Sequence, residues 1–297
     1  MSLLKPAKFF LGLSTALVVV SIALFIVPGP RLSIDFTGGT MMEVRIPEET
    51  TRGDIAAAID GFTSETELGN VTLAMTKDSS VLLRMRDITN EEHIALQKHL
   101  RSELGQIKEL QFTTIGPTVG ATLKKRSFWA LGIASLAIVL YIAFVFRKIP
   151  RKLSPWRFGI IAVITLLHDV FITVGIFVII SHTTSFEFDT LFITALLTIL
   201  GYSVNDTIVI FDRIRDNLAE QGRKEDFAAV ADRSLSDSVT RSINTSVSTL
   251  IMLSSLFILG SESIRWFVLT LMVGSIIGTY SSLFLATPLL VFWKKKA

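Results

Sequence analysis

The sequence predicts a polytopic α-helical membrane protein with six transmembrane helices and a ferredoxin-like α+β domain between helices 1 and 2. Three observations lead to this fold class. Half of the 297 residues are hydrophobic and only 19% are charged, and the chain contains six apolar stretches of membrane-spanning length. The long segment between the first two stretches is polar and alternates between strand and helix periodicity.

The six apolar stretches are the expected membrane spans. A spanning helix needs about 20 apolar residues, because each backbone polar group must find its partner within the segment. The first stretch could instead be a secretory signal peptide, since Lys5 and Lys8 precede it. However, it exceeds the roughly 7 to 15 residues of a signal h-region, and Pro28-Gly29-Pro30-Arg31 offers no cleavage site, so we expect an uncleaved anchor. The spans are expected at residues 9–27, 128–146, 158–180, 189–211, 242–259 and 266–293.

The spans divide the chain into an N-terminal part (residues 1–27), a domain outside the membrane (28–127) and a part with helices 2–6 (128–297). Within the domain, periodicity predicts strands at 41–46, 71–76, 81–86 and 107–114, and helices at 51–60 and from the capping box that begins at Thr89 to Gly105. The order β-α-β-β-α-β is that of a ferredoxin-like split unit.

Residues 212–240, between spans four and five, mix acids and bases, with apolar residues at helical spacing. Either an amphipathic helix on the cytoplasmic face or a helix pair packed under the bundle fits this pattern.

Basic residues predict the orientation, since Lys and Arg concentrate in cytoplasmic loops. The loop after the second span carries Arg147, Lys148, Arg151, Lys152 and Arg157, whereas residues 181–188 contain neither Lys nor Arg. We therefore expect a multi-pass protein of the cytoplasmic membrane, with both termini cytoplasmic and residues 28–127 on the other side. This basic cluster is expected to determine topology, with contact to anionic membrane lipid as a lesser role.

Several function classes are excluded by composition. The net charge is +3, but the basic residues lie at the ends of apolar runs rather than in one patch, so we expect no nucleic-acid partner. The chain has no Cys, and its four His residues are scattered. No Walker, triad or metal-ligand pattern occurs, so we expect no enzyme, no cofactor and no metal.

Asp206 is the main candidate for function, because an ionisable residue inside a span costs about 2.5 to 3.5 kcal/mol and needs a reason to be there. Helical spacing predicts that Asn205 and Asp206 lie on one stripe that faces other helices. Arg241 begins the next span at a similar depth, so an Asp206–Arg241 pair is expected. The alternatives are a proton site, an ordinary structural pair, and a purely snorkelling Arg241.

Two further features lie in the spans. His168 and Asp169 are candidates for a proton relay, with a static interhelical hydrogen bond as the alternative. Because neighbouring helix positions point about 100° apart, we expect these two side chains not to form one site. Gly274 and Gly278 form a Gly-x-x-x-Gly pattern that predicts close helix packing.

Three strings in the sequence resemble the SecF subunits of the SecD/SecF protein-export family. They are GYSVNDTIVIFDRIRDN from residue 201, IDFTGGT from residue 34 and TRSINTS from residue 240, and the resemblance extends over the whole chain. The first string is long and specific, whereas Asp-Phe-x-Gly-Gly is shared with SecD. The matching motif residues are Asp35, Gly38, Gly39, Gly201, Asp212 and Arg213.

The resemblance implies a bacterial inner-membrane protein, with residues 28–127 periplasmic, that is related to the resistance-nodulation-division exporters. It implies SecD, the SecYEG translocon and the translocating preprotein as partners. The implied function is to use the proton-motive force in late steps of Sec-dependent export, with Asp206 and Arg241, together with the neighbouring Asn205, linked to proton conduction. The residues themselves leave open a proton-coupled small-molecule exporter half, a non-transporting scaffold of the export channel, and Na⁺ rather than H⁺ as the coupling ion.

Overall fold

The computed structural model describes residues 4–47, 49–62, 68–75, 80–148, 154–221 and 226–295. It consists of two compact units. The helical unit combines Met1–Arg31 with Phe128–Ala297, and the α+β unit is Leu32–Ser127. The expected basic residues Arg151 and Lys152 lie outside the described residues.

Within the described residues, six helices are long and apolar enough to cross a membrane, which confirms the predicted number of spans. The last of them continues from α9 through a short π-helix, η2 (Ser282–Ala286), into α10 (Thr287–Lys295). A 3₁₀ turn, η1 (Phe146–Lys148), follows α5. The bounds are α1 (Ala7–Ile26), α5 (Pro117–Val145), α6 (Pro155–Thr183), α7 (Thr190–Gln221), α8 (Phe227–Leu259) and α9 (Glu262–Ser281).

Two helix boundaries differ from the prediction. α5 begins at Pro117, about three turns before the expected start at Phe128, because its first turns are more polar than the apolar stretch that follows. In the described residues of 212–240, α7 continues through Arg213 to Gln221 and α8 begins at Phe227, so the described part of this segment belongs to the two long helices. This is the helix-pair alternative, and Phe227 and Leu235 are buried in the bundle core.

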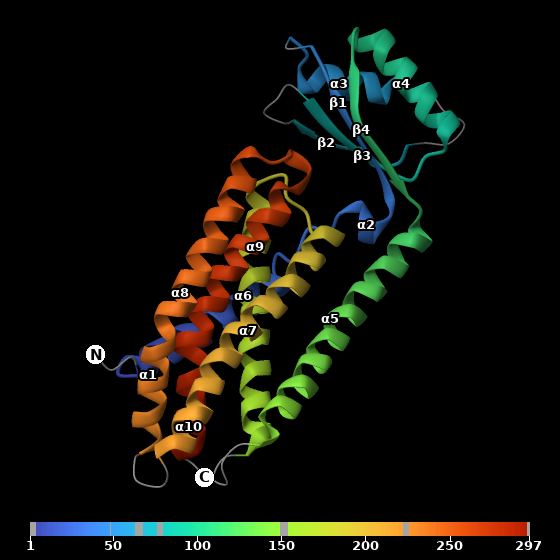
Figure 1. Ribbon diagram of the computed structural model, residues 1–297. Helices are drawn as coiled ribbons and strands as arrows, with labels where there is room; N and C mark the ends of the chain where they lie inside the picture. The colour runs from blue at the N-terminus through green and yellow to red at the C-terminus, as the bar shows by residue number, and fades with distance from the viewer. Residues whose placement is uncertain are drawn as a thin grey trace. The chain divides into compact units, whose positions relative to one another are not determined.

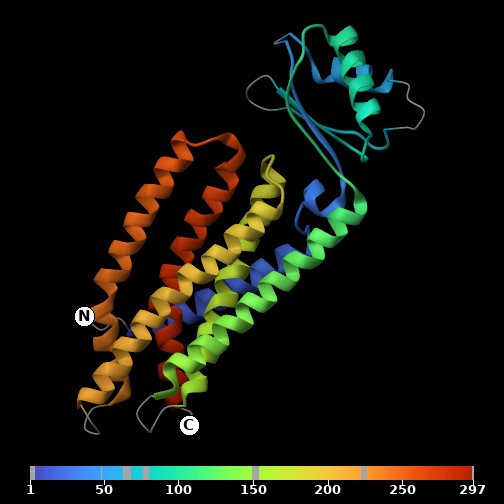
Figure 2. The same cartoon turned by 45° about the vertical axis from the view of Figure 1, so that its right-hand side comes forward.

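The membrane bundle is organised around α7 and α9, which run side by side (Figures 1 and 2). Two glycines of α9 face α7 and allow this approach. A Cβ atom on Gly274 would lie 2.1 Å from Ile199 Cδ1, and one on Gly278 would lie 3.0 Å from Ser203 Cβ. A third close approach joins α1 and α6, where a Cβ on Gly175 would lie 2.3 Å from Ser21 Oγ. Small residues at these positions let backbones pack closely in the absence of a hydrophobic driving force.

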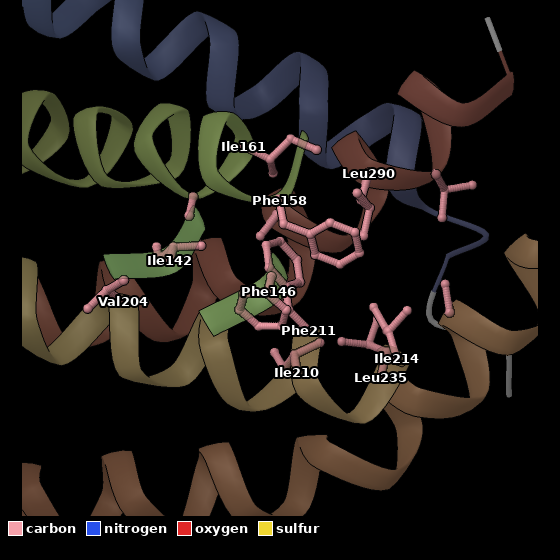
Figure 3. Packing of buried hydrophobic residues seen from close by; sticks show 14 of the residues in the cluster. Ile142, Phe146, Phe158, Ile161, Val204, Ile210, Phe211, Ile214, Leu235 and Leu290 are labelled. Carbon is pink, nitrogen blue, oxygen red and sulfur yellow. The ribbon is translucent and has the colours of Figure 1, made fainter. Parts of the chain in front are cut away.

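A cluster of buried hydrophobic residues that includes three phenylalanines packs the helices of the bundle together (Figure 3). The rings of Phe146, Phe158 and Phe211 are fully buried and come from η1, α6 and α7. Their centroids lie 5.4 Å apart for Phe146 and Phe158, and 5.1 Å apart for Phe158 and Phe211. Aromatic rings at this distance stabilise a helix junction by more than the burial of their apolar surface alone.

The α+β unit has the predicted ferredoxin-like order. Its four strands form an antiparallel sheet in the order β2-β3-β1-β4, so the first and third strands are central. Thr51 and Thr89 each cap a helix with a complete capping box, as the spacing at Thr89 predicted. A short helix, α2, precedes the sheet. The bounds are α2 (Ile34–Thr37), β1 (Gly39–Arg45), α3 (Arg52–Asp60), β2 (Thr72–Met75), β3 (Ser80–Met85), α4 (Asn90–Leu104) and β4 (Lys108–Ile115).

The core of this unit lies between the sheet and its two longer helices. Met42 and Leu83 of the central strands and Ile55 and Leu96 of the helices are fully buried. These residues follow the period-2 and helical patterns that predicted the elements. The domain therefore has a hydrophobic core of its own, separate from that of the bundle.

Candidate functional site

Asp206 lies on α7 inside the bundle, with 7% of its surface exposed. Two hydroxyl groups hold its carboxylate. Ser242 Oγ on α8 donates to Oδ1 at 3.0 Å, and Ser282 Oγ on η2 donates to Oδ2 at 3.4 Å. Among the described residues, the ion pairs that the structure forms within 4.0 Å do not include Asp206. The acid is therefore buried among hydroxyls rather than paired with a cation.

The expected Asp206–Arg241 pair is not formed, and this prediction is wrong for the isolated chain. Arg241 is exposed, whereas its neighbour Ser242 is fully buried and faces Asp206. The two positions differ by about 100° around α8, so only one of them can face α7. Ser238, Ser242 and Ser246 recur every fourth residue and form the buried face of α8.

Asn205 also differs from the predicted stripe. It is exposed, while Asp206 beside it is buried. Other members of the quoted motif lie away from the acid as well: Gly201 is exposed, Arg213 pairs with Asp237 at 3.1 Å, and Asp212 pairs with Arg215 at 2.7 Å. These ion pairs belong to the helical extensions of α7 and α8 beyond the buried acids.

His168 and Asp169 do form one site, contrary to the expectation from helix geometry. His168 Nδ1 and Asp169 Oδ1 lie 2.9 Å apart, and both side chains are buried. The side chains bend toward each other although their Cβ atoms diverge. Asp169 Oδ2 accepts from Ser203 Oγ at 2.5 Å and from Ser281 Oγ at 2.8 Å. A fully buried carboxylate thus joins α6, α7 and α9.

The two acids share the helices that hold them. Ser281 contacts Asp169 and the adjacent Ser282 contacts Asp206, where α9 gives way to the π-helix. On α7, Ser203 contacts Asp169 and lies one turn before Asp206. π-Helical turns inside α-helices occur often at functional sites. Ser281 and Ser282 contact two different acids at the point where the helix geometry changes.

Further hydroxyl groups extend the polar interior beyond the acids. Ser246 Oγ lies 2.5 Å from Thr279 Oγ1 and accepts from Tyr202 OH at 3.0 Å. These contacts join α7, α8 and α9, the helices that also surround Asp206. The residues were visible in the sequence, but Ser and Thr are common in packed membrane helices and give a weak signal on their own.

The Gly-Gly motif lies in the α+β unit, where the chain enters and leaves the sheet. A Cβ on Gly38 would lie 2.8 Å from Pro117 Cα, and one on Gly39 would lie 2.7 Å from the Met85 carbonyl oxygen. Similarly, a Cβ on Gly120, in the first turn of α5, would lie 2.9 Å from the Gly38 nitrogen. Gly38 and Gly39 both have positive φ. The motif therefore permits two chain segments to cross at backbone contact.

Asp35 belongs to the same segment. It is half-buried in the first turn of α2, and its backbone N–H donates to Ser33 Oγ at 3.2 Å. The geometry thus separates the motif residues into two groups: Asp35, Gly38 and Gly39 form the crossing, and Asp206 belongs to the bundle.

The described residues form six apolar helices, with a small α+β domain between the first two and buried carboxyls in the bundle. These features define a multi-pass membrane protein with a polar interior. Residues 95–296 match the family model of the protein export membrane protein SecD/SecF, C-terminal, and residues 23–46 match the SecD/SecF GG motif. The chain belongs to the SecD/SecF family of protein-export membrane proteins. It is accordingly a multi-pass inner-membrane protein.

Individual relatives agree with this assignment. Protein translocase subunit SecF of Thermobaculum terrenum is 39% identical over 97% of this chain and 92% of its own length. Protein translocase subunit SecF of Sebaldella termitidis is 35% identical over 99% of this chain and 92% of its own length. These similarities cover the α+β domain as well as the bundle.

Solved structures of SecDF, described in one case as a translocon-associated membrane protein from Thermus thermophilus, also match. That structure aligns with a TM-score of 0.85 at 30% identity, over 99% of this chain. SecDF in a super-membrane-facing form aligns with a TM-score of 0.70 at 30% identity, over 100% of this chain. The chain spans 39% of the length of each SecDF chain.

Proposed function

We propose that this chain is a SecF subunit that works with SecD and uses the proton-motive force to assist late steps of Sec-dependent protein translocation. The family and the similarity to SecF subunits support the role in export. The observation that carries the coupling is Asp206, a buried carboxyl held only by hydroxyl groups within the described part of the chain.

Hydroxyl partners suit an acid that changes its protonation state. A serine hydroxyl donates to a carboxylate and can accept from a carboxylic acid, so Ser242 and Ser282 can serve Asp206 in both states. A cationic partner would favour only the ionised form. An intramembrane carboxyl that alternates between two satisfied states is a means of carrying a proton across part of the bilayer.

The distribution of basic residues supports the orientation in which both termini are cytoplasmic and residues 28–127 are periplasmic. In this orientation Asp206 lies near the middle of α7, and the α+β domain is on the side on which an exported chain emerges. Protons driven by the proton-motive force would then enter from the side on which the exported chain emerges, and the helices that bind the proton would transmit its effect.

An exposed polar surface on α7 and α8 supports SecD as a partner. Asn205, Arg241 and Asn244 are exposed within helices that are otherwise apolar enough to span the membrane. Lipid would leave these groups without hydrogen-bond partners. A helix of SecD that covers this surface would provide such partners, and it would bring a further polar group to Arg241 beside the buried Asp206.

The test uses membrane vesicles that contain the SecD complex of this chain and an export substrate. Asp206→Asn removes the ionisable group and retains a hydrogen-bonding side chain of similar size. The matched control is Asp189→Asn, because Asp189 caps α7 through the Phe192 N–H at 2.7 Å and Asn caps equally well. We expect Asp206→Asn to lose the proton-driven part of export, with SecD assembly retained, and Asp189→Asn to export as the wild type does.

Wild-type export at the full rate by an assembled Asp206→Asn complex would contradict the proposal and favour a scaffold role. Collapsing the H⁺ and Na⁺ gradients separately identifies the ion: we expect only loss of the H⁺ gradient to reduce export. Drug sensitivity on deletion of the chain, without an export defect, would instead favour a small-molecule exporter half.

A further inference from the structure

The carboxyl of Asp169 is as deeply placed as Asp206 but is not used by the proposed function. No part of its surface is exposed, and its two oxygens have three hydrogen-bond partners: His168, Ser203 and Ser281. A charged residue at this depth is costly and needs a reason. The nearest explanation, a fixed His⁺–carboxylate pair, does not agree with the surroundings of the imidazole.

His168 has the environment of a neutral ring. Its Nδ1 contacts Asp169, but its Nε2 is buried and has no hydrogen-bond partner among the described residues. The ring stacks near Tyr280, at 6.2 Å between centroids, and the Tyr280 hydroxyl contacts Ser14 Oγ at 3.0 Å instead. A protonated His168 would bury an unpaired N–H, whereas a neutral ring with hydrogen on Nδ1 donates to Asp169 and leaves only a lone pair at Nε2.

Each acid competes for its serine hydroxyl with a backbone carbonyl. Ser281 Oγ lies 2.8 Å from Asp169 Oδ2 and 3.1 Å from the Gly278 carbonyl oxygen. Ser282 Oγ lies 3.4 Å from Asp206 Oδ2 and 3.0 Å from the Thr279 carbonyl oxygen. A hydroxyl has one hydrogen to donate. An ionised carboxylate attracts that hydrogen, and a protonated acid releases it to the carbonyl of the preceding turn.

We propose that Asp169 is a second proton-binding carboxyl, and that its protonation is linked to that of Asp206 through the adjacent residues Ser281 and Ser282 at the α9–η2 junction. The proposal rests on the proposed role of Asp206 and extends it to a two-site proton-binding unit. The proton binds a carboxylate oxygen of Asp169, and the Ser281 hydroxyl then donates to the Gly278 carbonyl. No other bond changes.

The linkage has a structural basis in the junction. Gly278 and Thr279 carbonyl oxygens both accept the Ser282 backbone N–H, so the two competing carbonyls belong to one hydrogen-bonded turn. A change in either serine alters the same turn, and a π-helical segment follows it directly. On α7, Ser203 and Asp206 lie one turn apart, so movement of either also affects both sites.

Few other ionisable groups face the two acids. His168 on α6 contacts Asp169, Tyr280 is on α9, and Tyr202 on α7 donates to Ser246. Arg241 on α8 is exposed. The two carboxyls are therefore the principal titrating groups in this part of the described bundle, and each is expected to influence the other.

The test is infrared difference spectroscopy on the reconstituted SecD complex, which detects the C=O band of protonated carboxyls as a function of pH. Difference spectra between variant and wild type remove the contribution of SecD. We expect Asp169→Asn and Asp206→Asn each to remove one band, and Asp189→Asn to remove none of the buried bands. We also expect the midpoint of the remaining band to change by about one pH unit, the interaction at which two sites titrate as a pair.

Ser281→Ala provides a variant that leaves both carboxyls in place. We expect it to change the midpoint of both bands, because it removes the hydroxyl that links them. A spectrum of Asp169→Asn identical to the wild type would overturn the second site. If either acid titrates at an unchanged midpoint when the other is Asn, or if Ser281→Ala moves only one band, the linkage is wrong. These outcomes are independent of the export assay, so they can fail while Asp206→Asn still abolishes proton-driven export.

Discussion

Replacing Gly274 by Ala should destabilise the bundle at the contact between α9 and α7. A Cβ at this position would lie 2.1 Å from Ile199 Cδ1, 2.4 Å from Cγ1 and 2.9 Å from Cγ2, whereas ordinary contacts begin near 3.4 Å. The Ile199 side chain, or α9 itself, must move by more than one ångström. Overpacking of this kind costs about 1–3 kcal/mol, which exceeds the gain of up to about 1 kcal/mol that Ala brings to a helix.

A double-mutant cycle identifies the cause. Ile199→Ala alone should cost about 2–5 kcal/mol through the cavity that it leaves. Combined with Gly274→Ala, the cost should be less than the sum, because the new methyl group occupies part of that cavity, with a coupling of about 0.5–3 kcal/mol. The control is Gly132→Ala on α5, where a Cβ has no neighbour within 4 Å.

The assay is reversible unfolding of the purified chain in mixed detergent micelles, followed by tryptophan fluorescence. Gly132→Ala should be neutral or slightly stabilising. Additive costs in the double variant, or equal stabilities of Gly274→Ala and Gly132→Ala, would refute the reasoning and show that α7 and α9 are not in close contact.

Two further predictions concern the α+β unit. Gly38→Ala should destabilise the chain crossing by about 1–3 kcal/mol, because φ is positive at this residue and the new Cβ would lie 2.8 Å from the backbone of Pro117. Faster proteolysis of the domain in membranes would show this loss of stability. The control is Gly53→Ala, whose Cβ would have its nearest contact at 3.6 Å. Hydrogen bonding to Arg86, followed by the Thr89 backbone N–H, lowers the pKa of Glu92 below its ordinary value near 4.5. Glu92 therefore stabilises the fold above pH 4.5 and loses this contribution as the pH falls through the lowered pKa. Glu92→Gln should unfold more readily than the wild type at neutral pH, and this difference in stability should vanish in acid. Equal differences at both pH values would contradict the assignment.

Much of the fold follows from periodicity in the sequence. Apolar length gives the six spans, and alternation with capping boxes gives the sheet domain, because these signals are local. The start of α5 was predicted too late because Lys124, Lys125 and Arg126 interrupt the apolar pattern, although the helix continues through them. Polarity marks where the apolar stretch begins, and backbone hydrogen bonding determines where the helix begins.

The site was predictable only in part. Asp206 is identifiable from its cost in an apolar run, but its partner is not, because the choice between Arg241 and Ser242 depends on the rotation of α8. Helical-wheel reasoning fixes relative positions on one helix and leaves that rotation open. It also assumes straight side chains, which is why it separated His168 from Asp169. The π-helix that follows Ser281 has no sequence signal that we recognise.

The hydroxyl partners of Asp206 have an energetic consequence for the proposed coupling. Breaking a buried ion pair by neutralising one partner costs about 3–5 kcal/mol, whereas a hydrogen bond to a charged group contributes about 1.5–3 kcal/mol. One proton that crosses 100 mV supplies about 2.3 kcal/mol. A membrane potential of that size could not release an Asp206 that was locked to a buried Arg, but it is comparable with the bond from Ser242. An Arg that stays exposed at the helix surface, as Arg241 does here, therefore leaves the acid free to change state.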